Sequence, residues 1–260
     1  MADLKTQSVP ALDRALTLLE TLVQSKRGLA LSDLSRKLGL PKSSIHCLLL
    51  TLERRGYLHR DQLTRRYVFG LKFFSMAHAS SASLDLRQKA RPFLIRLGEL
   101  TRLTVHMAVL EEAEAVLIEK IEPPTLLNLA TWVGKRMDVH CTGVGKALLA
   151  FLPDDELALL LARHRFPRRN EFTIVSPRKL KEHLAKIREK GYAVDDEEDE
   201  IGLRCVGAPI IDHGGRAVAA ISVSGAVAQI ADENLEAIAA QVKQAAHRIS
   251  SELGYQRRNG

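Results

Sequence analysis

Apolar residues recur at helical spacing in the first quarter of the chain. Between Val9 and about Ser25 they fall every three or four positions, at Leu12, Ala15, Leu16, Leu19 and Leu22. This spacing predicts an amphipathic helix over residues 9–25. A second, short helix is expected over 31–38, with Ser32 as its N-cap and Gly39 as the left-handed residue that follows its end.

A third helix is expected from Pro41, because a missing N–H does no harm in a first helical turn. Its apolar stripe, which must face a core, is formed by Ile45, Leu48, Leu49 and Leu52. The opposite face carries Ser43, Cys47, Leu50 and Arg54, flanked by Ser44, His46 and Thr51. Two helices joined by a short glycine-containing turn, the second with a small polar outer face, predict a helix-turn-helix whose second helix enters the major groove of DNA.

The segment after the third helix predicts a β-hairpin. Residues 57–70 (YLHRDQLTRRYVFG) are rich in strand formers on both sides of a turn at 61–64, and Arg60, Arg65 and Arg66 gather near its tip. Basic tips of such wings usually contact phosphates. The residues expected to contact DNA are Lys42, Ser43, Ser44, His46, Cys47, Thr51, Arg54, Arg65, Arg66 and Tyr67.

Charge separates this first part from the rest of the chain. Residues 1–75 hold 13 Lys and Arg against 6 Asp and Glu, whereas the other 185 residues hold 25 of each sign. A small basic module joined to a larger neutral one indicates one part that meets a polyanion and another with a different task. The three cysteines form no CxxC pair, and neither a signal peptide nor a long apolar run is evident. We therefore expect a cytoplasmic protein without a membrane span, a disulfide framework or a zinc ribbon.

The neutral part predicts an α+β fold. A linker helix is expected after Gly70, then a helix over 85–101 in which Pro92 lies near the start or forms a kink. β-rich runs follow at 104–110, 114–121, 126–133, 202–211 and 216–225, the last two flanking the turn DHGG. Helices are expected at 143–152, 154–163, 177–190 and 232–253. Antiparallel strands with helices packed on them give this fold class.

Three local patterns could form a ligand site, and each has a simpler explanation. TGVGKA is a glycine-rich turn that opens a helix, where free N–H groups suit an anion, although Gly143 and Gly145 could equally serve close packing. It is not a phosphate loop, because His140 and Ala147 stand where that motif needs glycine and a hydroxyl residue. The acidic run 195–200 is ordinarily a solvated loop. Ser222 and Ser224 lie two apart on a strand and so share a face, where neighbouring backbone could satisfy both.

Taken together, the motifs resemble those of the IclR family of bacterial transcription regulators. The resemblance rests on SVPALDRALTLLETL, LSDLSRKLGLPKSSIHCLLLTLERRGYL, RRYVFGLKFFSMA, HCTGVGKALLA, GYAVDDEEDEIGLRC and AAISVSG, in that order. It implies an N-terminal winged helix-turn-helix, a linker helix and a C-terminal GAF-like effector-binding domain. The corresponding boundaries are a tail at 1–8, a DNA-binding domain at 9–70, the linker helix at 71–85, the effector domain at 86–256 and a tail at 257–260. By resemblance, members act as homodimers or dimers of dimers on promoter DNA, as repressors or activators, and respond to a small metabolite.

The resemblance also implies where the metabolite binds. The matching polar positions are Gly143, Val144, Asp195, Cys205, Ser222 and Ser224, and the apolar walls are Leu126, Leu129, Met137 and Leu203. Such a pocket would hold a carboxylate through N–H groups and hydroxyls. Asp195 would accept from a ligand hydroxyl or be protonated, because two bare carboxylates in contact repel. A small oxo- or hydroxy-carboxylate is expected, with a weakly acidic aromatic as a variant.

One departure from the family pattern concerns the third helix. Its usual sequence resembles PKSTVHRLL, but here Ser44 replaces the threonine and Cys47 the arginine. An arginine can read guanine with two hydrogen bonds and a cysteine cannot. More of the affinity is therefore expected to rest on phosphate contacts by Lys42, Arg54, Arg65 and Arg66.

Three other functions were weighed. Cys205 could be the nucleophile of an enzyme, with His106 or His140 as its base, although no local motif supports the pairing and no catalytic activity is expected. His140, Cys141 and Cys205 could bind a metal, but adjacent His and Cys are poorly spaced for chelation, so neither a metal nor a cofactor is expected. The neutral part could also serve only for oligomerisation, which ligand-dependent stabilisation would distinguish.

Overall fold

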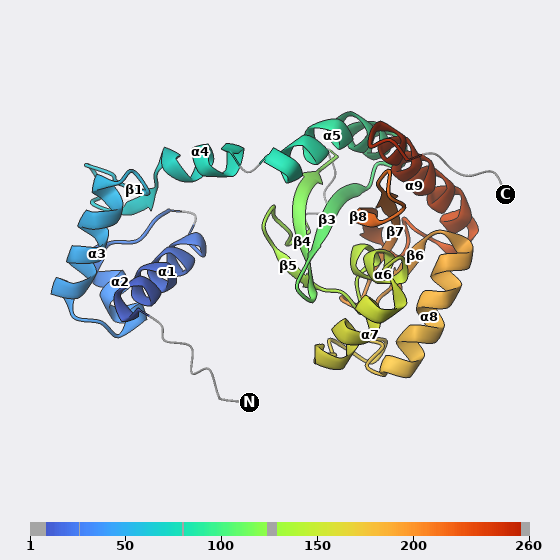
Figure 1. Ribbon diagram of the computed structural model, residues 1–260, viewed down its shortest axis with the longest axis horizontal. Helices are drawn as coiled ribbons and strands as arrows, with labels where there is room; N and C mark the ends of the chain where they lie inside the picture. Colours follow the sequence, from blue (N-terminus) through green and yellow to red (C-terminus); the bar gives the residue numbers. More distant parts are fainter. Residues whose placement is uncertain (1–8, 26, 80, 124–128, 256–260) are drawn as a thin grey trace. The chain divides into compact units, whose positions relative to one another are not determined.

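The computed structural model describes residues 9–25, 27–79, 81–123 and 129–255, and within these ranges the side chains outside 74, 77–79 and 81–85. The expected tails at 1–8 and 257–260 and the expected pocket residue Leu126 lie outside the described residues. Backbone contacts divide the chain into two compact units, Met1–Ser81 and Ala82–Gly260. Figure 1 shows both, and each is described by itself.

The first unit is a winged helix-turn-helix. It contains α1 (Pro10–Val23), α2 (Leu31–Leu38), α3 (Lys42–Arg54), β1 (Leu58–Arg60), β2 (Tyr67–Phe69) and α4 (Leu71–Ala79). The two strands pair antiparallel, and backbone bonds between Leu29 and Tyr67 attach the segment before α2 to the same ribbon. One apolar cluster holds these elements together, with Leu18, Leu22, Leu34, Ile45, Leu49, Leu58 and Tyr67 at its centre.

The helix-turn-helix matches the expected pattern except at two helix starts. Gly39 takes the left-handed conformation (φ +64°) that ends α2. However, α2 begins at Leu31, so its N-cap is Ala30 and not Ser32, and Asp33 accepts a hydrogen bond from the Ala30 N–H (3.4 Å). Pro41 is the extended residue before α3 and not its first helical residue.

The second unit is built on one six-stranded antiparallel sheet. Its elements are α5 (Ser81–Thr101), β3 (Thr104–Glu111), β4 (Glu114–Ile121), β5 (Arg136–Asp138), α6 (Gly143–Ala150), α7 (Asp154–Arg163), α8 (Pro177–Lys190), β6 (Ala193–Asp196), β7 (Leu203–Ile211), β8 (Ala217–Ala226) and α9 (Asp232–Glu252). The strand order is β5-β4-β3-β8-β7-β6. Strand β8 therefore pairs with β3 on one side and β7 on the other, which brings distant parts of the sequence together.

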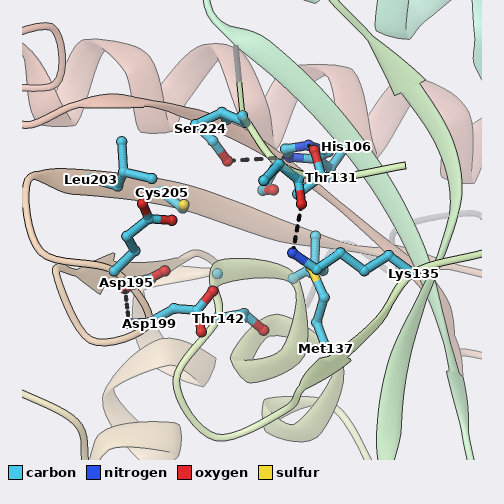
Figure 2. A pocket seen from close by; sticks show the side chains of 16 residues that line it. His106, Thr131, Lys135, Met137, Thr142, Asp195, Asp199, Leu203, Cys205 and Ser224 are labelled. Carbon is cyan, nitrogen blue, oxygen red and sulfur yellow. Dashed lines mark hydrogen bonds between the residues drawn. The ribbon is translucent and has the colours of Figure 1, made fainter. Parts of the chain in front are cut away.

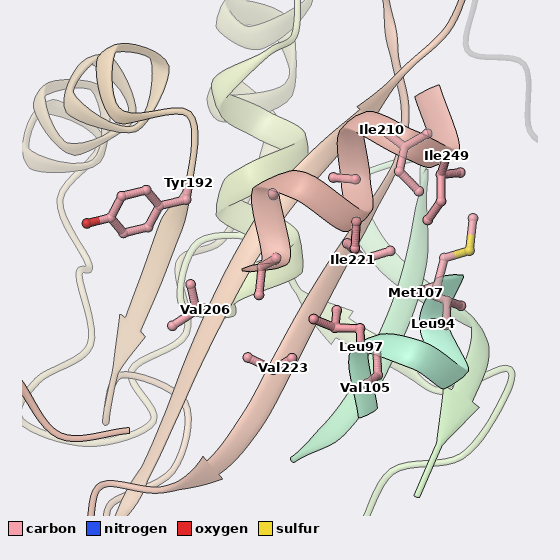
Figure 3. Packing of buried hydrophobic residues seen from close by; sticks show 14 of the residues in the cluster. Leu94, Leu97, Val105, Met107, Tyr192, Val206, Ile210, Ile221, Val223 and Ile249 are labelled. Atoms are coloured by element: carbon pink, nitrogen blue, oxygen red, sulfur yellow. The ribbon is translucent and has the colours of Figure 1, made fainter. Parts of the chain in front are cut away.

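Helices cover both faces of this sheet. Alternate residues of the central strands, such as Val105, Val206 and Val223, pack against α5 and α9 (Figure 3). The intervening residues face α6, α7 and α8, where Ala108 and Ala220 join a second apolar cluster. The α+β class expected from the sequence is confirmed. On the second face, polar side chains replace apolar ones near one end of the strands.

The structure of this unit decides three local points that the sequence left uncertain or predicted wrongly. No strand forms at 129–133, because the carbonyls of Leu129 and Thr131 accept hydrogen bonds from the Lys120 ammonium (3.1 and 2.9 Å) and do not pair with a strand. The edge strand of the sheet is β5. Asp195 belongs to β6 and not to a solvated loop, since it pairs with Cys205. Helix α5 begins at Ser81, so Pro92 lies inside it; of the two alternatives expected for Pro92, a place near the helix start is excluded.

None of the described helices combines the length and apolar character needed to cross a bilayer.

Candidate functional sites

The outer face of α3 is open within the first unit. Ile45 and Leu49 are fully buried, whereas the opposite side exposes Lys42, Ser43, His46, Cys47, Leu50, Thr51 and Arg54, with Ser44 half-buried. The Thr51 hydroxyl donates to the Cys47 carbonyl (2.8 Å) and leaves the Cys47 thiol uncovered. This face can therefore meet a groove directly, as its polarity predicts.

The hairpin between β1 and β2 is held in one conformation by Asp61. One carboxylate oxygen, Oδ1, accepts from the N–H groups of Leu63 (3.1 Å) and Thr64 (2.7 Å) and from the Thr64 hydroxyl (2.8 Å). These bonds lower the pKa of Asp61, so the turn stays charged and closed. The turn presents Arg65, which is exposed and has φ +58°.

Two of the hairpin residues expected to contact DNA are engaged inside the protein. Tyr67 is 2% exposed and packs in the core beneath the Arg60 guanidinium, so the expectation that its side chain contacts DNA was wrong. Residues 67 and 68 point to opposite faces of the two-stranded ribbon, and Tyr67 takes the face toward the core. Arg66 is half-buried and donates to the Gly28 carbonyl (2.9 Å). Arg65 is therefore the more available cation of the pair.

A pocket opens on the sheet face that carries α6. Water-sized molecules can occupy about 60 Å³ of it, enough for a few waters or a small ligand. Its lining includes nine of the ten residues expected from the sequence: Leu129, Met137, Gly143, Val144, Asp195, Leu203, Cys205, Ser222 and Ser224. In Figure 2, Lys135 and Met137 enter from the side opposite Asp195 and Leu203.

His106 lies at one end of the pocket and is 4% exposed. Its Nδ1 is 3.3 Å from the Ser224 hydroxyl and its Nε2 is 2.8 Å from that of Thr131. Burial, with smaller contributions from Lys120 and Lys135, lowers the pKa of His106 to about 3. The imidazole is therefore neutral and positions two hydroxyls that can turn toward a ligand.

Asp195 lies at the other end and is 3% exposed. Its Oδ1 accepts from the N–H groups of Glu198 (2.9 Å) and Asp199 (3.4 Å). Burial raises the pKa of Asp195 to about 7, although Lys146 nearby opposes the shift. A carboxyl group that is partly protonated at neutral pH can both donate to a ligand and tolerate an anion beside it.

The first turn of α6 forms the floor between these ends. Thr142 caps the helix by accepting from the Gly145 N–H (3.2 Å), and among the described residues no partner meets the N–H groups of Gly143 and Val144. Gly143 approaches β7 so closely that a Cβ on Gly207 would lie 2.4 Å from the Gly143 carbonyl oxygen. Both glycines are thus required for packing, and the same packing leaves two N–H donors at the pocket.

Behind the pocket, Lys146 and Glu198 form a buried ion pair. The Lys146 side chain is fully buried, donates to the Val194 carbonyl (2.5 Å) and contacts Glu198 Oε1. Glu198 Oε2 has no partner among the described residues, and burial raises the pKa of this carboxyl. The lysine of TGVGKA therefore ties α6 to β6 and does not line the pocket.

Sequence reasoning missed the other seven lining residues of the pocket: His106, Ala130, Thr131, Lys135, Thr142, Asp199 and Glu200. Thr131 belongs to the segment 126–133, which was expected to be a strand, and Lys135 follows that segment, so nothing in the sequence indicates that either residue approaches the pocket. The polar His106 within an otherwise apolar strand was the one available sign.

The arrangement does not support a cysteine nucleophile. Burial raises the pKa of the Cys205 thiol well above its ordinary value, and the neighbouring Asp195 adds to the shift. Among the described residues no hydrogen bond joins Cys205 to a histidine, since His106 binds Ser224 and Thr131. A thiol in this setting stays protonated and is a poor nucleophile.

Both units match known families. Residues 11–62 match the IclR helix-turn-helix domain, and residues 78–251 match the domain described as bacterial transcriptional regulator IclR C-terminal. The HTH-type transcriptional regulator XynR of Escherichia coli K12 is 36% identical over 247 residues, which are 95% of this chain and 98% of that protein.

Solved structures give the same result. The structure of the Thermotoga maritima IclR protein aligns with a TM-score of 0.82 and 33% identity, covering 95% of this chain and 99% of that one. An IclR homologue from Microbacterium hydrocarbonoxydans, solved in complex with 4-hydroxybenzoate, aligns with a TM-score of 0.83 and 26% identity, covering 94% and 99%.

Proposed function

The chain belongs to the IclR family of bacterial transcriptional regulators, and on that premise we propose that it binds operator DNA through α3 and the β1–β2 hairpin and is controlled by a small hydroxy- or oxo-carboxylate held in the pocket. Its relatives are transcriptional regulators and not enzymes. The proposed DNA contacts are Lys42, Ser43, Ser44, His46, Cys47, Thr51, Arg54, Arg65 and Arg66.

One observation carries the effector part of this proposal: the pocket combines hydrogen-bond donors on its floor and at the His106 end with a partly protonated carboxyl group, Asp195, at the other end. The N–H groups of Gly143 and Val144 and the hydroxyls of Ser222 and Ser224 would hold a ligand carboxylate. Asp195 would bind the hydroxyl or oxo group of the same ligand. The 4-hydroxybenzoate bound by a structural relative has both kinds of group.

The mechanism follows from differential binding. We infer that the protein binds promoter DNA as a homodimer or a dimer of dimers, with residues 9–70 as the DNA-binding domain, 71–85 as the linker and 86–256 as the effector domain. An effector that binds one arrangement of the assembly more tightly shifts the population toward it. The DNA affinity of the assembly then changes by the same coupling free energy that changes the effector affinity.

Thermal unfolding of the intact protein with a panel of small carboxylic acids tests the effector site. A hydroxy or oxo acid should raise the melting temperature, because a ligand that binds only the folded state stabilises it. The plain acid of the same carbon skeleton should have a smaller effect. Ser222→Ala should reduce the shift, whereas Ser251→Ala, at an exposed serine of α9, should leave it unchanged.

The alternative, a C-terminal domain that only oligomerises, predicts a different result. In that case no member of the panel would raise the melting temperature of the wild type. Equal shifts for wild type and Ser222→Ala would instead place the ligand outside this pocket.

A further inference from the structure

A cluster of metal-ligand side chains lies beside the pocket, and neither the DNA-binding nor the effector function uses it. Asp138, at the end of β5, and His140 and Cys141, before α6, place a carboxylate oxygen, an imidazole nitrogen and a thiol within 4.8 Å of one another. His140 and Cys141 are fully buried, and the Asp138 side chain is 14% exposed. Cys205, which the sequence had grouped with His140 and Cys141, is not in this cluster.

A fourth candidate ligand comes from the segment after α7. His164 Nε2 lies 2.9 Å from His140 Nδ1, and the two rings are 4.9 Å apart between centroids. His164 contacts His140 but lies outside the group of three, and with it the candidate ligands are one carboxylate, two imidazoles and one thiol, all of which are zinc ligands in proteins. Mg²⁺ and Ca²⁺ prefer oxygen ligands alone, so this set selects against them.

The surroundings of the cluster orient its ligands. His140 Nε2 is 3.0 Å from the Pro167 carbonyl, which can only accept, so Nε2 carries the proton and the lone pair of Nδ1 faces His164. Arg169 contacts only the Oδ2 atom of Asp138, through both Nε (2.8 Å) and Nη2, which leaves Oδ1 for another partner. Outer contacts of this kind, to the far side of each ligand, accompany metal sites in proteins.

Acidic side chains lie around the thiol. Asp138, Asp195, Glu198 and Asp199 all act electrostatically on Cys141, and the Cys141 thiol is 3.8 Å from Asp199 Oδ1. Arg169 binds Asp138, Lys146 binds Glu198, and Lys135 acts on Asp199. These surroundings are acidic enough to accept a cation beside the thiol.

We propose that Asp138, His140, Cys141 and His164 bind one zinc-type transition-metal ion per chain. On binding, the metal replaces the thiol proton, which passes to solvent, and His164 adopts the tautomer with its proton on Nδ1. Asp199 contacts Cys141 and also lines the pocket, so an ion here would alter the field in which the effector binds. This inference does not depend on the identity of the effector.

Co²⁺ titration of the intact, untagged and chelator-treated protein tests the site, because a cobalt–thiolate bond gives a charge-transfer absorption band. The wild type should show the band, saturate at one Co²⁺ per chain and lose the cobalt signal when Zn²⁺ is added. Cys141→Ser should abolish the band, and His164→Gln should weaken binding by at least about tenfold. Cys47→Ser and Cys205→Ser are the matched controls and should retain the band.

Several outcomes would overturn the proposal: no stoichiometric binding by the wild type, a band that persists in Cys141→Ser, or a band lost equally in Cys205→Ser. Circular dichroism in the presence of chelator establishes that each variant is folded. If Cys141→Ser does not fold, His164→Gln tests the site, because His164 is only half-buried. Undiminished Co²⁺ affinity in His164→Gln would exclude His164 as a ligand.

Discussion

At the scale of single residues, burial sets the chemistry of the pocket. His106 and Asp195 are both almost fully buried, and each is shifted toward its neutral form. Burial disfavours charge on either kind of group, which lowers the pKa of a histidine and raises that of a carboxyl. The two ends of the pocket that His106 and Asp195 form are therefore largely neutral, so a ligand carboxylate at either end need not face a full opposing charge on that residue.

Asp195 should make the stability of the protein depend on pH. Its pKa is about 7 in the folded state and about 3.9 in an unfolded chain, so the folded state holds a proton that the unfolded state releases between those values. The free energy of unfolding should therefore fall as pH rises from about 4 to 7, by up to about 1.4 kcal/mol per pH unit, and level off above 7. Urea unfolding of the wild type across this range measures the fall.

Asp195→Asn is the matched variant, because its amide oxygen can accept the same two backbone N–H groups. The free energy of unfolding of the variant should not fall with pH through this residue. The difference in unfolding free energy between wild type and variant should therefore shrink or reverse above pH 7. Parallel pH profiles for the two proteins would show that Asp195 is ionised throughout.

At the scale of elements, the pocket depends on how closely α6 approaches β7. Gly207 leaves no room for a side chain, since its Cβ would lie 2.4 Å from the backbone oxygen of Gly143. Gly207→Ala should force α6 away from the sheet, destabilise the protein by about 1–3 kcal/mol and reduce effector-dependent stabilisation. Chemical unfolding with and without ligand measures both effects.

Gly98 offers the control for that substitution. A Cβ there would meet Val105 and Ile121 side chains at 3.4 and 3.5 Å, which is ordinary contact, and the residue lies inside α5. Gly98→Ala should be neutral or stabilising by up to about 1 kcal/mol. Equal losses in both variants would mean that the approach of α6 to β7 has no special role.

The buried Lys146–Glu198 pair fixes the middle of α6. Lys146→Met should cost about 3–5 kcal/mol, because it leaves Glu198 buried without a counter-charge. The double variant Lys146→Met with Glu198→Gln should recover part of the loss, since the uncompensated charge is gone. The denaturant midpoints of the wild type, the single variant and the double variant measure the recovery. If the double variant is no more stable than Lys146→Met, the uncompensated charge of Glu198 is not the cause of the loss.

Elements with a strong local period were predictable, and those defined by distant contacts were not. The expected bounds of α7 and α8 agree with the structure, because their apolar stripes and caps are local. The segment 126–133 has the composition of a strand. The backbone carbonyls of its described residues 129–131 instead accept hydrogen bonds from the ammonium groups of Lys120 and Lys135. Asp195 sits in an acidic run, and only pairing with β7 makes it part of a strand.

The pocket shows the same division. The shared face of Ser222 and Ser224 follows from strand alternation alone, whereas grouping them with Asp195, Cys205 and Gly143 required the family resemblance. Tyr67 was misassigned because a basic, aromatic hairpin gives no local sign of which ring enters the core.

At the scale of the whole molecule, the surplus positive charge belongs to the unit that contains the helix-turn-helix. Residues 1–75 carry seven more positive than negative side chains, and residues 76–260 carry equal numbers. Because binding to DNA releases counterions in proportion to the phosphates contacted, the salt dependence of affinity should report on the first unit alone.

Replacing both Arg65 and Arg66 with alanine should weaken binding to all DNA sequences. The slope of log affinity against log salt concentration should become less steep by up to about two. Arg66 also bonds the Gly28 carbonyl, so Arg65→Ala alone separates the phosphate contact from any change in the hairpin. Fluorescence anisotropy over a salt series gives the slopes.

The control removes two exposed cations from the second unit, Arg178 and Lys181 of α8. Arg178→Ala with Lys181→Ala should leave the slope unchanged. If both double variants flatten it equally, the charge that meets DNA is not confined to the first unit.

The order of strands in the sheet has a consequence for protein synthesis. Strand β8 lies between β3 and β7, and it carries Ser222 and Ser224, yet it is the last strand that the ribosome makes. The helix-turn-helix unit is therefore synthesised before the strand that carries these two pocket serines. A transcript that ends before codon 217 therefore encodes a protein with the helix-turn-helix unit but without β8, the strand that carries Ser222 and Ser224.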